Sequence, residues 1–188
     1  MDTFLEGLKQ QLRAKDKNQA LKFQKNHFEE LKMRLQDLII ERNSFSVGSR
    51  LDSGGSGTVY KGQLFYEDVA IKVLNLGTMG FKQIANVVKE IIVLSRVRHP
   101  NVITLYGVCL HKQDMFIVTE YFENKSLHNY MKKNKGKLTF LIKVEILLDI
   151  AKSLMYLHSL ESPIIHRDIK PHNILISNDL RAKVADFG

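Results

Sequence analysis

Cysteine and proline are scarce in this chain of 188 residues, which contains one cysteine and three prolines. The single cysteine, Cys109, excludes an internal disulfide and a zinc site built from cysteines. It lies in the apolar stretch YGVCL, which predicts a buried thiol. No run of about 18 apolar residues is present, so we expect no transmembrane helix. The opening MDTFLEGLKQ is charged throughout and lacks the apolar centre of a signal peptide. These absences favour a reducing, intracellular environment, and we expect a cytoplasmic protein.

Acidic residues are outnumbered by basic ones, which gives a net charge of +8. Such a balance can indicate a nucleic-acid or anionic-membrane partner. Here the lysines are spread along the chain, with one short cluster, KKNKGK, at 132–137. A solvated loop after a helix is favoured over a polyanion-binding patch for this cluster. No platform of aromatic and arginine residues accompanies it, so we expect no nucleic-acid partner.

The first 43 residues predict helix. Residues 2–42 contain no proline and a single glycine. Apolar residues recur there in different registers: Leu5, Leu8 and Leu12; Leu21, Phe28 and Leu35; Leu31 and Leu38. We therefore interpret 1–43 as one or two amphipathic helices. Two alternatives stay open, a short coiled coil that associates with itself or with a partner, and a helix packed on the following domain.

From Phe45 onward the pattern changes to short segments rich in β-branched and aromatic residues. These segments predict five antiparallel strands, at 45–51, 58–64, 68–74, 102–110 and 115–121. Helices are predicted at about 79–97, at 126–133 and at 138–159, and two short strands surround a turn in ILISNDLRAKVA. We expect an α+β fold with two lobes over 44–188. A five-stranded antiparallel lobe with one helix would occupy 44–121, and an incomplete helical lobe would occupy 122–188.

Three glycines, Gly54, Gly55 and Gly57, lie between the first two predicted strands in LDSGGSGTVY. Glycines at such a place let backbone N–H groups approach a bound phosphate. Taken alone, the pattern is more typical of a hairpin turn. The motif GxxxxGKS/T is absent, and so is a strand–GxGxxG–helix unit, which excludes a Walker-type loop and argues against a dinucleotide-binding fold.

The segment VAIK places Ala70 and Lys72 on one face of a strand, because alternate residues share a face. Ala70 leaves room for a flat ring, and Lys72 places a cation beyond it. In the next helix, Glu90 shares a face with Val87 and Leu94. A carboxylate within an apolar stripe is costly unless it is paired, so we predict that Glu90 pairs with Lys72.

The segment HRDIKPHN lies between two apolar runs and holds the chemistry-bearing residues of the second lobe. Asp168 can orient a hydroxyl and accept its proton, and Lys170 can neutralise the charge of a phosphoryl group in transit. Asn173 offers an amide oxygen suited to Mg²⁺, and Asp186 offers a second oxygen ligand. Phosphoryl transfer requires these parts: a positioned metal, a positioned nucleophile and cations.

Taken together, the glycine loop, VAIK, the helix glutamate, HRDIKPHN and DFG occur in the order of the protein-kinase signature set. From Phe45 to Gly188 the chain resembles a eukaryotic protein kinase. HPNVITLYGVC and FIVTEYFENKSLHNYM resemble the tyrosine-kinase-like group. DIKPHN resembles serine/threonine kinases, because Lys170 follows the aspartate by two positions.

This resemblance implies ATP and Mg²⁺ as cofactors and a protein hydroxyl as the acceptor. Lys72 would contact the α- and β-phosphates and pair with Glu90, and Asp168 would accept the hydroxyl proton. Asn173 and Asp186 would bind Mg²⁺. The adenine would be bound by the main chain of Glu120 and Phe122 and by the side chains of Leu51, Val59, Ala70, Thr119 and Leu175. An internal spine would comprise Leu94, Leu105, His166 and Phe187.

The chain departs from the family pattern at the glycine loop and at its end. Asp52 replaces the first loop glycine, and Ser56 replaces the usual aromatic residue at the tip. The family continues past DFG through an activation loop, an APE motif and further helices, so we expect a fragment of a kinase. The leading hypothesis is an ATP-dependent serine/threonine kinase in signalling, with dual specificity left open. The alternative is a non-catalytic, kinase-like nucleotide-binding or interaction module.

Overall fold

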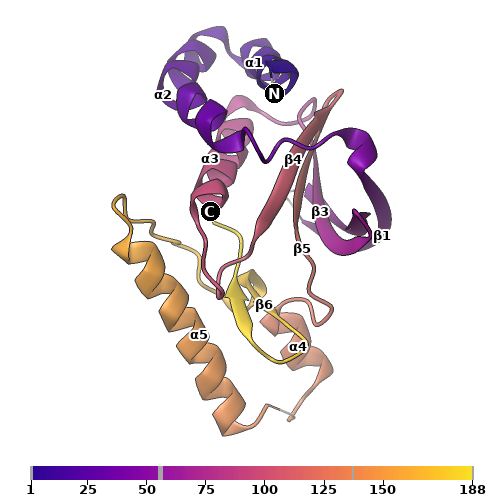
Figure 1. The fold of residues 1–188 in the computed structure, drawn as a ribbon, viewed down its shortest axis with the longest axis vertical. Helices are drawn as coiled ribbons and strands as arrows, with labels where there is room; N and C mark the ends of the chain where they lie inside the picture. The colour runs from indigo at the N-terminus through magenta and orange to yellow at the C-terminus, as the bar shows by residue number, and fades with distance from the viewer. Residues whose placement is uncertain (1, 55–56, 137, 188) are drawn as a thin grey trace. The chain divides into compact units, whose positions relative to one another are not determined.

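The computed structural model describes residues 2–54, 57–136 and 138–187, which divide into two compact units (Figure 1). The first unit comprises the described residues of 1–96 and 105–121. The second unit comprises 97–104 and the described residues of 122–188. Among all described residues, no helix combines the length and the apolar character that crossing a bilayer requires.

The N-terminal segment forms two helices, α1 (Asp2–Lys15) and α2 (Lys17–Leu35). Asp16 separates them, because its side chain caps α2 by accepting a hydrogen bond from the backbone N–H of Gln19 at 2.9 Å. The helices bury an apolar stripe: Leu5, Leu8, Leu12, Ala20, Phe28, Leu31 and Leu35. Leu21 shares the seven-residue spacing but is half exposed, because Ala20 and Phe23 fill the buried positions of that turn.

The first unit contains the predicted five-stranded antiparallel sheet, with the strand order β1-β2-β3-β5-β4. Its strands are β1 (Phe45–Gly54), β2 (Gly57–Leu64), β3 (Glu67–Asn75), β4 (Leu105–His111) and β5 (Asp114–Glu120). Helix α3 (Phe81–Arg96) follows β3, close to its predicted bounds. A short 3₁₀ turn, η1 (Arg42–Ser44), leads into β1.

Strand β4 begins three residues later than the sequence pattern predicts. Residues 102–104 belong to the second unit, where Val102 bridges Val184. The N–H of Ile103 donates to the carbonyl of Val184 at 2.9 Å. Val102 and Ile103 are apolar and β-branched, which suits pairing with β5 and pairing with β7 equally. The sequence pattern therefore does not reveal where one pairing ends and the other begins.

Alternation along β3 separates the two faces of the sheet. Val69 and Ile71 are fully buried in a core cluster that also includes Phe45, Cys109, Phe116 and Val118. Ala70 and Lys72 lie on the opposite face and are half-buried. Cys109 is buried as predicted, and burial raises the pKa of its thiol.

The edge of the sheet at β4 is paired with the segment that follows α2. The N–H of Ile40 donates to the carbonyl of Val108 at 3.0 Å, and the N–H of Val108 donates to the carbonyl of Leu38 at 2.7 Å. Gly107 is required beside this pairing, because a Cβ there would lie 2.9 Å from the Leu38 carbonyl oxygen. Main-chain bonds thus tie the N-terminal helices to the sheet.

The second unit consists of α4 (Leu127–Lys133), α5 (Phe140–Ser159), the 3₁₀ turn η2 (Pro171–Asn173) and a hairpin of β6 (Ile174–Ile176) and β7 (Ala182–Val184). The side chain of Ser126 caps α4 and that of Thr139 caps α5, each accepting a backbone N–H at 3.3 Å. The predicted helices and the two short strands are therefore present.

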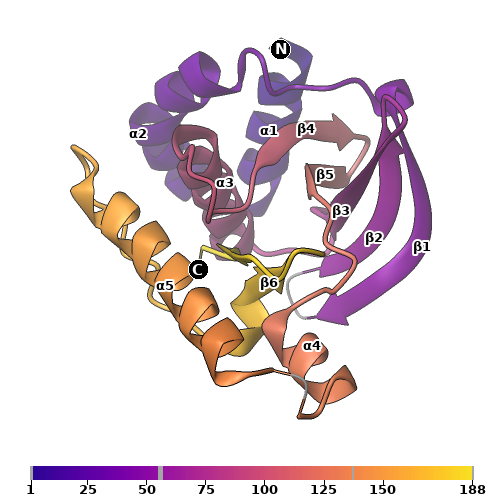
Figure 2. The same cartoon turned by 60° about the horizontal axis from the view of Figure 1, so that its bottom comes forward.

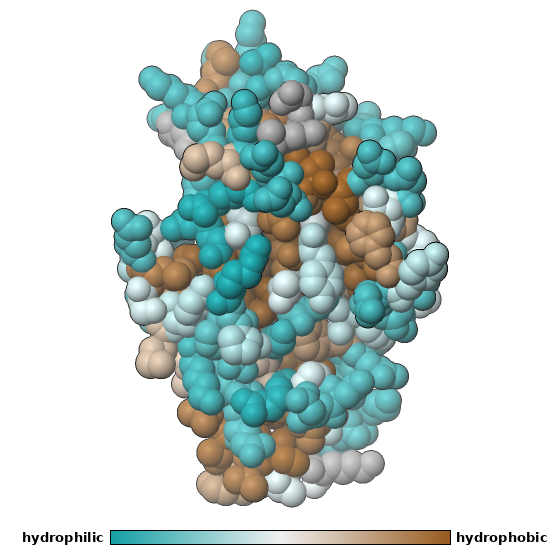
Figure 3. Space-filling view, viewed as in Figure 1, coloured by the Kyte–Doolittle hydropathy of each residue, from teal (hydrophilic) through white to brown (hydrophobic). Residues whose placement is uncertain are grey.

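The buried stripe of α5 differs from the predicted one, which ran through Leu147, Ile150, Ala151, Leu154 and Leu157. The buried residues are Ile146, Asp149, Ser153 and Leu157. Apolar side chains remain exposed elsewhere on the helix: Phe140, Leu141, Val144, Leu147, Leu148 and Met155. Hydrophobic surface is visible over the first turns of α5 (Figure 3). The helix is apolar on most of its circumference, so helical spacing alone did not identify the face that is buried here.

The turn between β2 and β3 is strained. Leu64 pairs with Glu67, so Phe65 and Tyr66 form a two-residue loop, and both have positive φ, 48° and 71°. Such loops favour Asn-Gly, because a side chain with a Cβ pays roughly 1–2 kcal/mol in the left-handed region. Both rings are exposed, at 72% and 96%, so little burial offsets this cost.

Replacing the two residues together, Phe65→Asn with Tyr66→Gly, is therefore expected to raise the free energy of unfolding by about 1–3 kcal/mol. Urea denaturation of the double variant measures the change. The reversed pair, Phe65→Gly with Tyr66→Asn, is the matched control and should gain less, because Gly-Asn suits the turn less well. A loss of stability in the first variant would show that the exposed rings hold the turn together.

Candidate active site

The predicted ion pair between Lys72 and Glu90 is present in the first unit. The Lys72 Nζ lies 3.2 Å from each oxygen of the Glu90 carboxylate. The two side chains are only 16% and 13% exposed. Lys72 extends from the middle of β3, and Glu90 extends from α3 between buried Val87 and Leu94. Partial burial favours the pair, because each charge would be costly there without the other.

Three predicted nucleotide-binding residues, Val59, Ala70 and Thr119, lie around Lys72 on the same face of the sheet. Val59 of β2 lies opposite Lys72, and Thr119 of β5 lies opposite Ala70. Residues directly opposite each other share a face, as do Ala70 and Lys72. All are half-buried. A small residue and short aliphatic and hydroxyl side chains thus line a sheet surface next to a cation.

Two further predicted residues of the first unit lie on β1 and β5. Leu51 is half-buried on β1 where the register shifts between Arg50 and Asp52, and Glu120 ends β5. The Asp52 carboxylate is exposed and accepts a hydrogen bond from the N–H of Ser53 at 2.7 Å. The negative charge in the loop is therefore solvated and engaged by its own backbone.

The glycine loop is described in part. Gly54 pairs with Gly57 at the ends of β1 and β2, whereas Gly55 lies outside the described residues. Gly57 has φ of +125°, and a Cβ there would lie 2.8 Å from the carbonyl oxygen of Val73. Only glycine fits this position without displacement of β3.

The second unit brings together the polar residues of HRDIKPHN around Asp168. The Lys170 Nζ lies 2.6 Å from Oδ2 of Asp168. The Nδ2 of Asn173 donates to the same Oδ2 and to the Asp168 carbonyl, both at 2.9 Å. These hydrogen bonds, first that from Lys170 and then that from Asn173, lower the pKa of Asp168. The carboxylate is consequently an ionised acceptor near neutral pH, next to a cation.

His166 supports the residues around Asp168 through hydrogen bonds at both of its ring nitrogens. Its Nε2 lies 2.9 Å from the carbonyl oxygen of Ala185, and its Nδ1 lies 3.3 Å from the N–H of Asp168. A carbonyl can only accept, so Nε2 carries the proton and Nδ1 accepts the Asp168 N–H. Phe187 packs on the imidazole with a centroid separation of 4.9 Å. His166 is 2% exposed and therefore links the segment before Asp168 to the DFG segment.

Two residues beside these groups have unusual backbone angles. Arg167 has φ of 65°, and Asp186 has φ of 56°. Such left-handed residues are rare outside glycine and cluster at functional sites. Arg167 directly precedes Asp168, and Asp186 is itself a predicted metal ligand. The unusual backbone angles therefore support a functional role for both segments.

The predicted Mg²⁺ ligands fit a site completed by substrate oxygens. Among the described residues, no group of three or more His, Cys, Asp or Glu side chains could hold a metal by itself. Mg²⁺ is commonly held by one or two protein oxygens together with phosphates and water. The Nδ2 of Asn173 donates to Asp168, so the Oδ1 of the same amide lies on the side away from that hydrogen bond. That oxygen and the Asp186 carboxylate are ligands of the required kind.

Two predicted adenine contacts also belong to the second unit. Phe122 is buried, and the Lys183 Nζ lies 5.8 Å from the centre of its ring. Leu175 lies on β6 opposite Lys183 and bridges Ser126. The prediction that these residues and those of the first unit surround one nucleotide stays a prediction.

One ionic contact that holds the second unit together involves no residue predicted from the sequence to matter. Asp149 of α5 is fully buried and accepts hydrogen bonds from Arg181 Nε at 2.8 Å and from the N–H of Ala182 at 3.0 Å. The contact fixes the β6–β7 hairpin, and therefore Leu175, against α5. The signal was present in the sequence, since Asp149 occupies the helical stripe that begins at Ile146.

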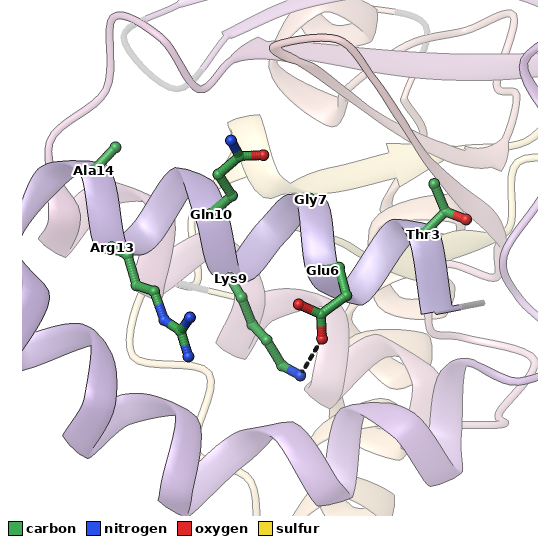
Figure 4. Close-up of a pocket in the computed structure, with 7 residues that line it drawn as sticks. All are labelled: Thr3, Glu6, Gly7, Lys9, Gln10, Arg13 and Ala14. Atoms are coloured by element: carbon green, nitrogen blue, oxygen red, sulfur yellow. Dashed lines mark hydrogen bonds and ion pairs between the residues drawn. The ribbon is translucent and has the colours of Figure 1, made fainter.

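A pocket of about 740 Å³ lies along α1, and no predicted site residue lines it (Figure 4). Its lining includes Glu6 and Lys9, which form an ion pair of 2.6 Å with each other. The other lining side chains also belong to α1: Thr3, Gln10, Arg13 and Ala14. The pocket shares no residue with the array around Asp168 or with the Lys72–Glu90 pair.

Comparison with known proteins identifies the family. The family model for protein tyrosine and serine/threonine kinases matches residues 45–188. A serine/threonine-protein kinase/receptor of Acanthamoeba polyphaga mimivirus is 40% identical over 150 residues, which cover 80% of this chain and 9% of that protein. A receptor protein kinase of Oryza sativa subsp. japonica is 39% identical over 163 residues, covering 84% of this chain and 18% of the relative.

A third relative, the calmodulin-binding receptor-like cytoplasmic kinase 1 of Arabidopsis thaliana, is 43% identical over 150 residues, which cover 77% of this chain and 32% of the relative. The chain thus belongs to the protein kinase family. It spans about a tenth to a third of the length of these curated relatives.

Proposed function

We propose that this protein is a serine/threonine kinase that transfers the γ-phosphoryl group of ATP to a protein hydroxyl. The observation that carries the proposal is the arrangement of Lys170 and Asn173 on the Asp168 carboxylate. An ionised acceptor with a cation at hydrogen-bond distance matches the needs of a hydroxyl that loses its proton while negative charge spreads over the phosphoryl group. Lys170 also supports serine or threonine as the acceptor.

Each site residue has a proposed role. Asp168 orients the hydroxyl and accepts its proton, and Lys170 neutralises charge on the transferred group. Lys72, held by Glu90, binds the α- and β-phosphates, and the glycine loop brings backbone N–H groups to them. Asn173 and Asp186 would hold Mg²⁺, which would supply positive charge against the phosphates. Leu51, Val59, Ala70, Thr119, Glu120, Phe122 and Leu175 bind the adenine.

We also propose a cytoplasmic location and a role in signalling. The reducing environment suggested by a single buried cysteine supports this, and so does the similarity to a receptor-like cytoplasmic kinase. The alternative of a non-catalytic kinase-like module is less well supported, because Lys72, Asp168, Asn173 and Asp186 all retain side chains suited to the chemistry.

The variant Lys72→Ala is expected to remove about half or more of the stabilisation that Mg·ATP confers on the protein. Charge-assisted hydrogen bonds contribute roughly 1.5–3 kcal/mol each, so the nucleotide should bind about ten- to a hundredfold more weakly. At a nucleotide concentration of about 100 times Kd, stabilisation should fall from about 2.7 kcal/mol to about 0.4 kcal/mol in the hundredfold case. The nucleotide-induced shift of the thermal transition measures it.

Lys89→Ala is the matched control, because it removes the same kind of side chain from an exposed position of α3 that has no proposed contact with nucleotide. Its nucleotide-induced shift should equal that of the unchanged protein. Equal shifts in both variants would contradict the role of Lys72 in phosphate binding.

A further inference from the structure

The two N-terminal helices pack beside α3 within the first unit (Figures 1 and 2). Phe23 of α2 meets Phe81, the first residue of α3, edge-on at a centroid separation of 6.0 Å. Glu30 of α2 lies 3.8 Å from Arg96, the last residue of α3. Helix α2 therefore contacts α3 at both ends.

These contacts lie on the side of α3 away from Glu90. Each helical residue advances by about 100°, so Glu90, nine residues after Phe81, lies about 180° around the axis. Ala85 and Ile92 share the side of Phe81, and each is only 6% exposed. Helix α3 is therefore covered on the side of α2 and presents Glu90 from the other side to Lys72.

The N-terminal helices are also fixed to the sheet. The Lys15 Nζ donates to the carbonyl oxygen of Gly77, in the loop between β3 and α3, at 2.7 Å. Gly7 of α1 approaches β4 so closely that a Cβ would lie 2.9 Å from the Leu110 side chain. Together with the bonds between Ile40 and Val108, these contacts make α1–α2 a bridge between the sheet and α3.

We propose that α1–α2 is a positioning element that holds α3 where Glu90 meets Lys72. The ion pair alone is a weak tether, because it is partly solvated and its desolvation offsets its attraction. The hold that the pair lacks comes chiefly from apolar packing between α2 and α3, which includes the contact of Phe23 with Phe81. The ionic contact of Glu30 with Arg96, at 3.8 Å, adds a smaller amount. This inference rests on the proposed function only in the role of the ion pair, which is to hold Lys72 for the phosphates. The position of α3 does not depend on that role.

Accessibility of the Lys72 amine tests the proposal without any measurement of activity. Lys72 is 16% exposed while Glu90 holds it, so an amine-reactive acetate ester should acetylate it slowly. Release of α3 uncovers the amine. The labelling rate of Lys72 in the unchanged chain is compared with that in variants by peptide mass spectrometry, and Lys61, 38% exposed on β2, serves as the internal reference.

The variant Phe23→Ala should raise the labelling rate of Lys72 about tenfold and leave that of Lys61 unchanged; a tenfold change corresponds to about 1.4 kcal/mol. Glu30→Arg and Arg96→Glu should each raise it by a smaller factor of about two to three, as expected for a partly exposed ion pair. The double variant that exchanges the two charges should return toward the original rate. A merely destabilising substitution would not be rescued in this way.

Glu29→Arg is the matched control, because it makes the same charge change at the neighbouring exposed position of α2. It should leave both rates unchanged. An unchanged Lys72 rate in Phe23→Ala would overturn the proposal. An equal rise at Lys61 would also overturn it, because α1–α2 would then support the whole sheet rather than α3.

The same assay separates this inference from the proposed function. Addition of Mg·ATP should protect Lys72 from labelling if the residue binds nucleotide. Absence of protection, with the response to Phe23→Ala intact, would count against nucleotide binding and leave the positioning role of α1–α2 standing. Protection by Mg·ATP, with a Lys72 labelling rate that does not respond to the α2 variants, would support nucleotide binding and overturn the positioning role of α1–α2.

Discussion

The substitution Asp168→Asn is expected to lower the rate of phosphoryl transfer by the full-length protein about 10²- to 10⁴-fold. An amide keeps the shape of the side chain and its contact with Lys170, but it can neither accept the hydroxyl proton nor carry the negative charge. Steady-state transfer to a peptide library that contains serine, threonine and tyrosine measures kcat and also reports the accepted hydroxyl. The KM for ATP should change little, because Asp168 is assigned to the hydroxyl and not to the nucleotide.

The matched control is Asp179→Asn in the turn between β6 and β7. Like Asp168, Asp179 accepts a hydrogen bond from a nearby side chain, in this case from the Ser177 Oγ at 2.5 Å. It has no role in the proposed chemistry, and its variant should keep the original rate. Equal rates for Asp168→Asn and Asp179→Asn would remove Asp168 from the mechanism and favour a non-catalytic module.

The second large effect concerns the stability of the second unit. Arg181→Met is expected to lower the free energy of unfolding by about 3 kcal/mol, because it leaves the buried carboxylate of Asp149 without its cation. Of the hydrogen bonds that Asp149 accepts from Arg181 and Ala182, the one from the Ala182 N–H, at 3.0 Å, would remain. Urea denaturation followed by far-ultraviolet circular dichroism measures the loss.

Lys143→Met is the matched control, because it removes one positive charge from an exposed position of α5. Its stability should lie within about 0.5 kcal/mol of the original value. A similar loss in both variants would mean that net charge, and not the contact with Asp149, determines the effect.

The stability that the contact between Asp149 and Arg181 contributes depends on pH in a direction that can be predicted. Burial by itself raises the pKa of Asp149, but the hydrogen bonds from Arg181 and the Ala182 N–H and the positive charge of Arg181 outweigh it, so the pKa is lowered. The contact therefore contributes stability above the ordinary value of about 3.8 and loses it as the pH falls through the folded-state pKa.

In Arg181→Met, burial prevails and the pKa of Asp149 should rise above its unfolded value. Protonation on acidification then relieves the unpaired charge. The difference in stability between the original protein and the variant should consequently shrink from pH 7 to pH 4. A difference that stays constant over this range would contradict a charge-based origin.

The sequence predicted those parts of the fold in which the local pattern of residues allows a side chain only one favourable placement. Alternation in VAIK predicted which side chains of β3 share a face, and a carboxylate in the apolar stripe of α3 predicted the contact between Lys72 and Glu90. The same reasoning applies to Asp149. It was not identified because α5 is apolar on several sides, so another stripe fitted the helical spacing equally well.

Contacts between elements distant in sequence could not be predicted in this way. An apolar stripe on α2 indicates that the helix is buried but not against what, and several partners would satisfy it equally. Its placement beside α3 depends on Phe23, Glu30 and the pairing of Ile40 with Val108, none of which has a local sequence signature. The start of β4 could not be predicted for the same reason, because Val102 and Ile103 pair with Val184 instead.

The pairing of Leu38–Ile40 with β4 has a consequence for how the protein behaves at high concentration. An unpaired outer strand offers a row of N–H and carbonyl groups to any extended segment of another molecule, which is a common start of aggregation. Here part of that row is already satisfied from within the chain. Shortened versions that begin after Ile40 would present it to their neighbours, so recombinant production and storage favour retention of the N-terminal residues.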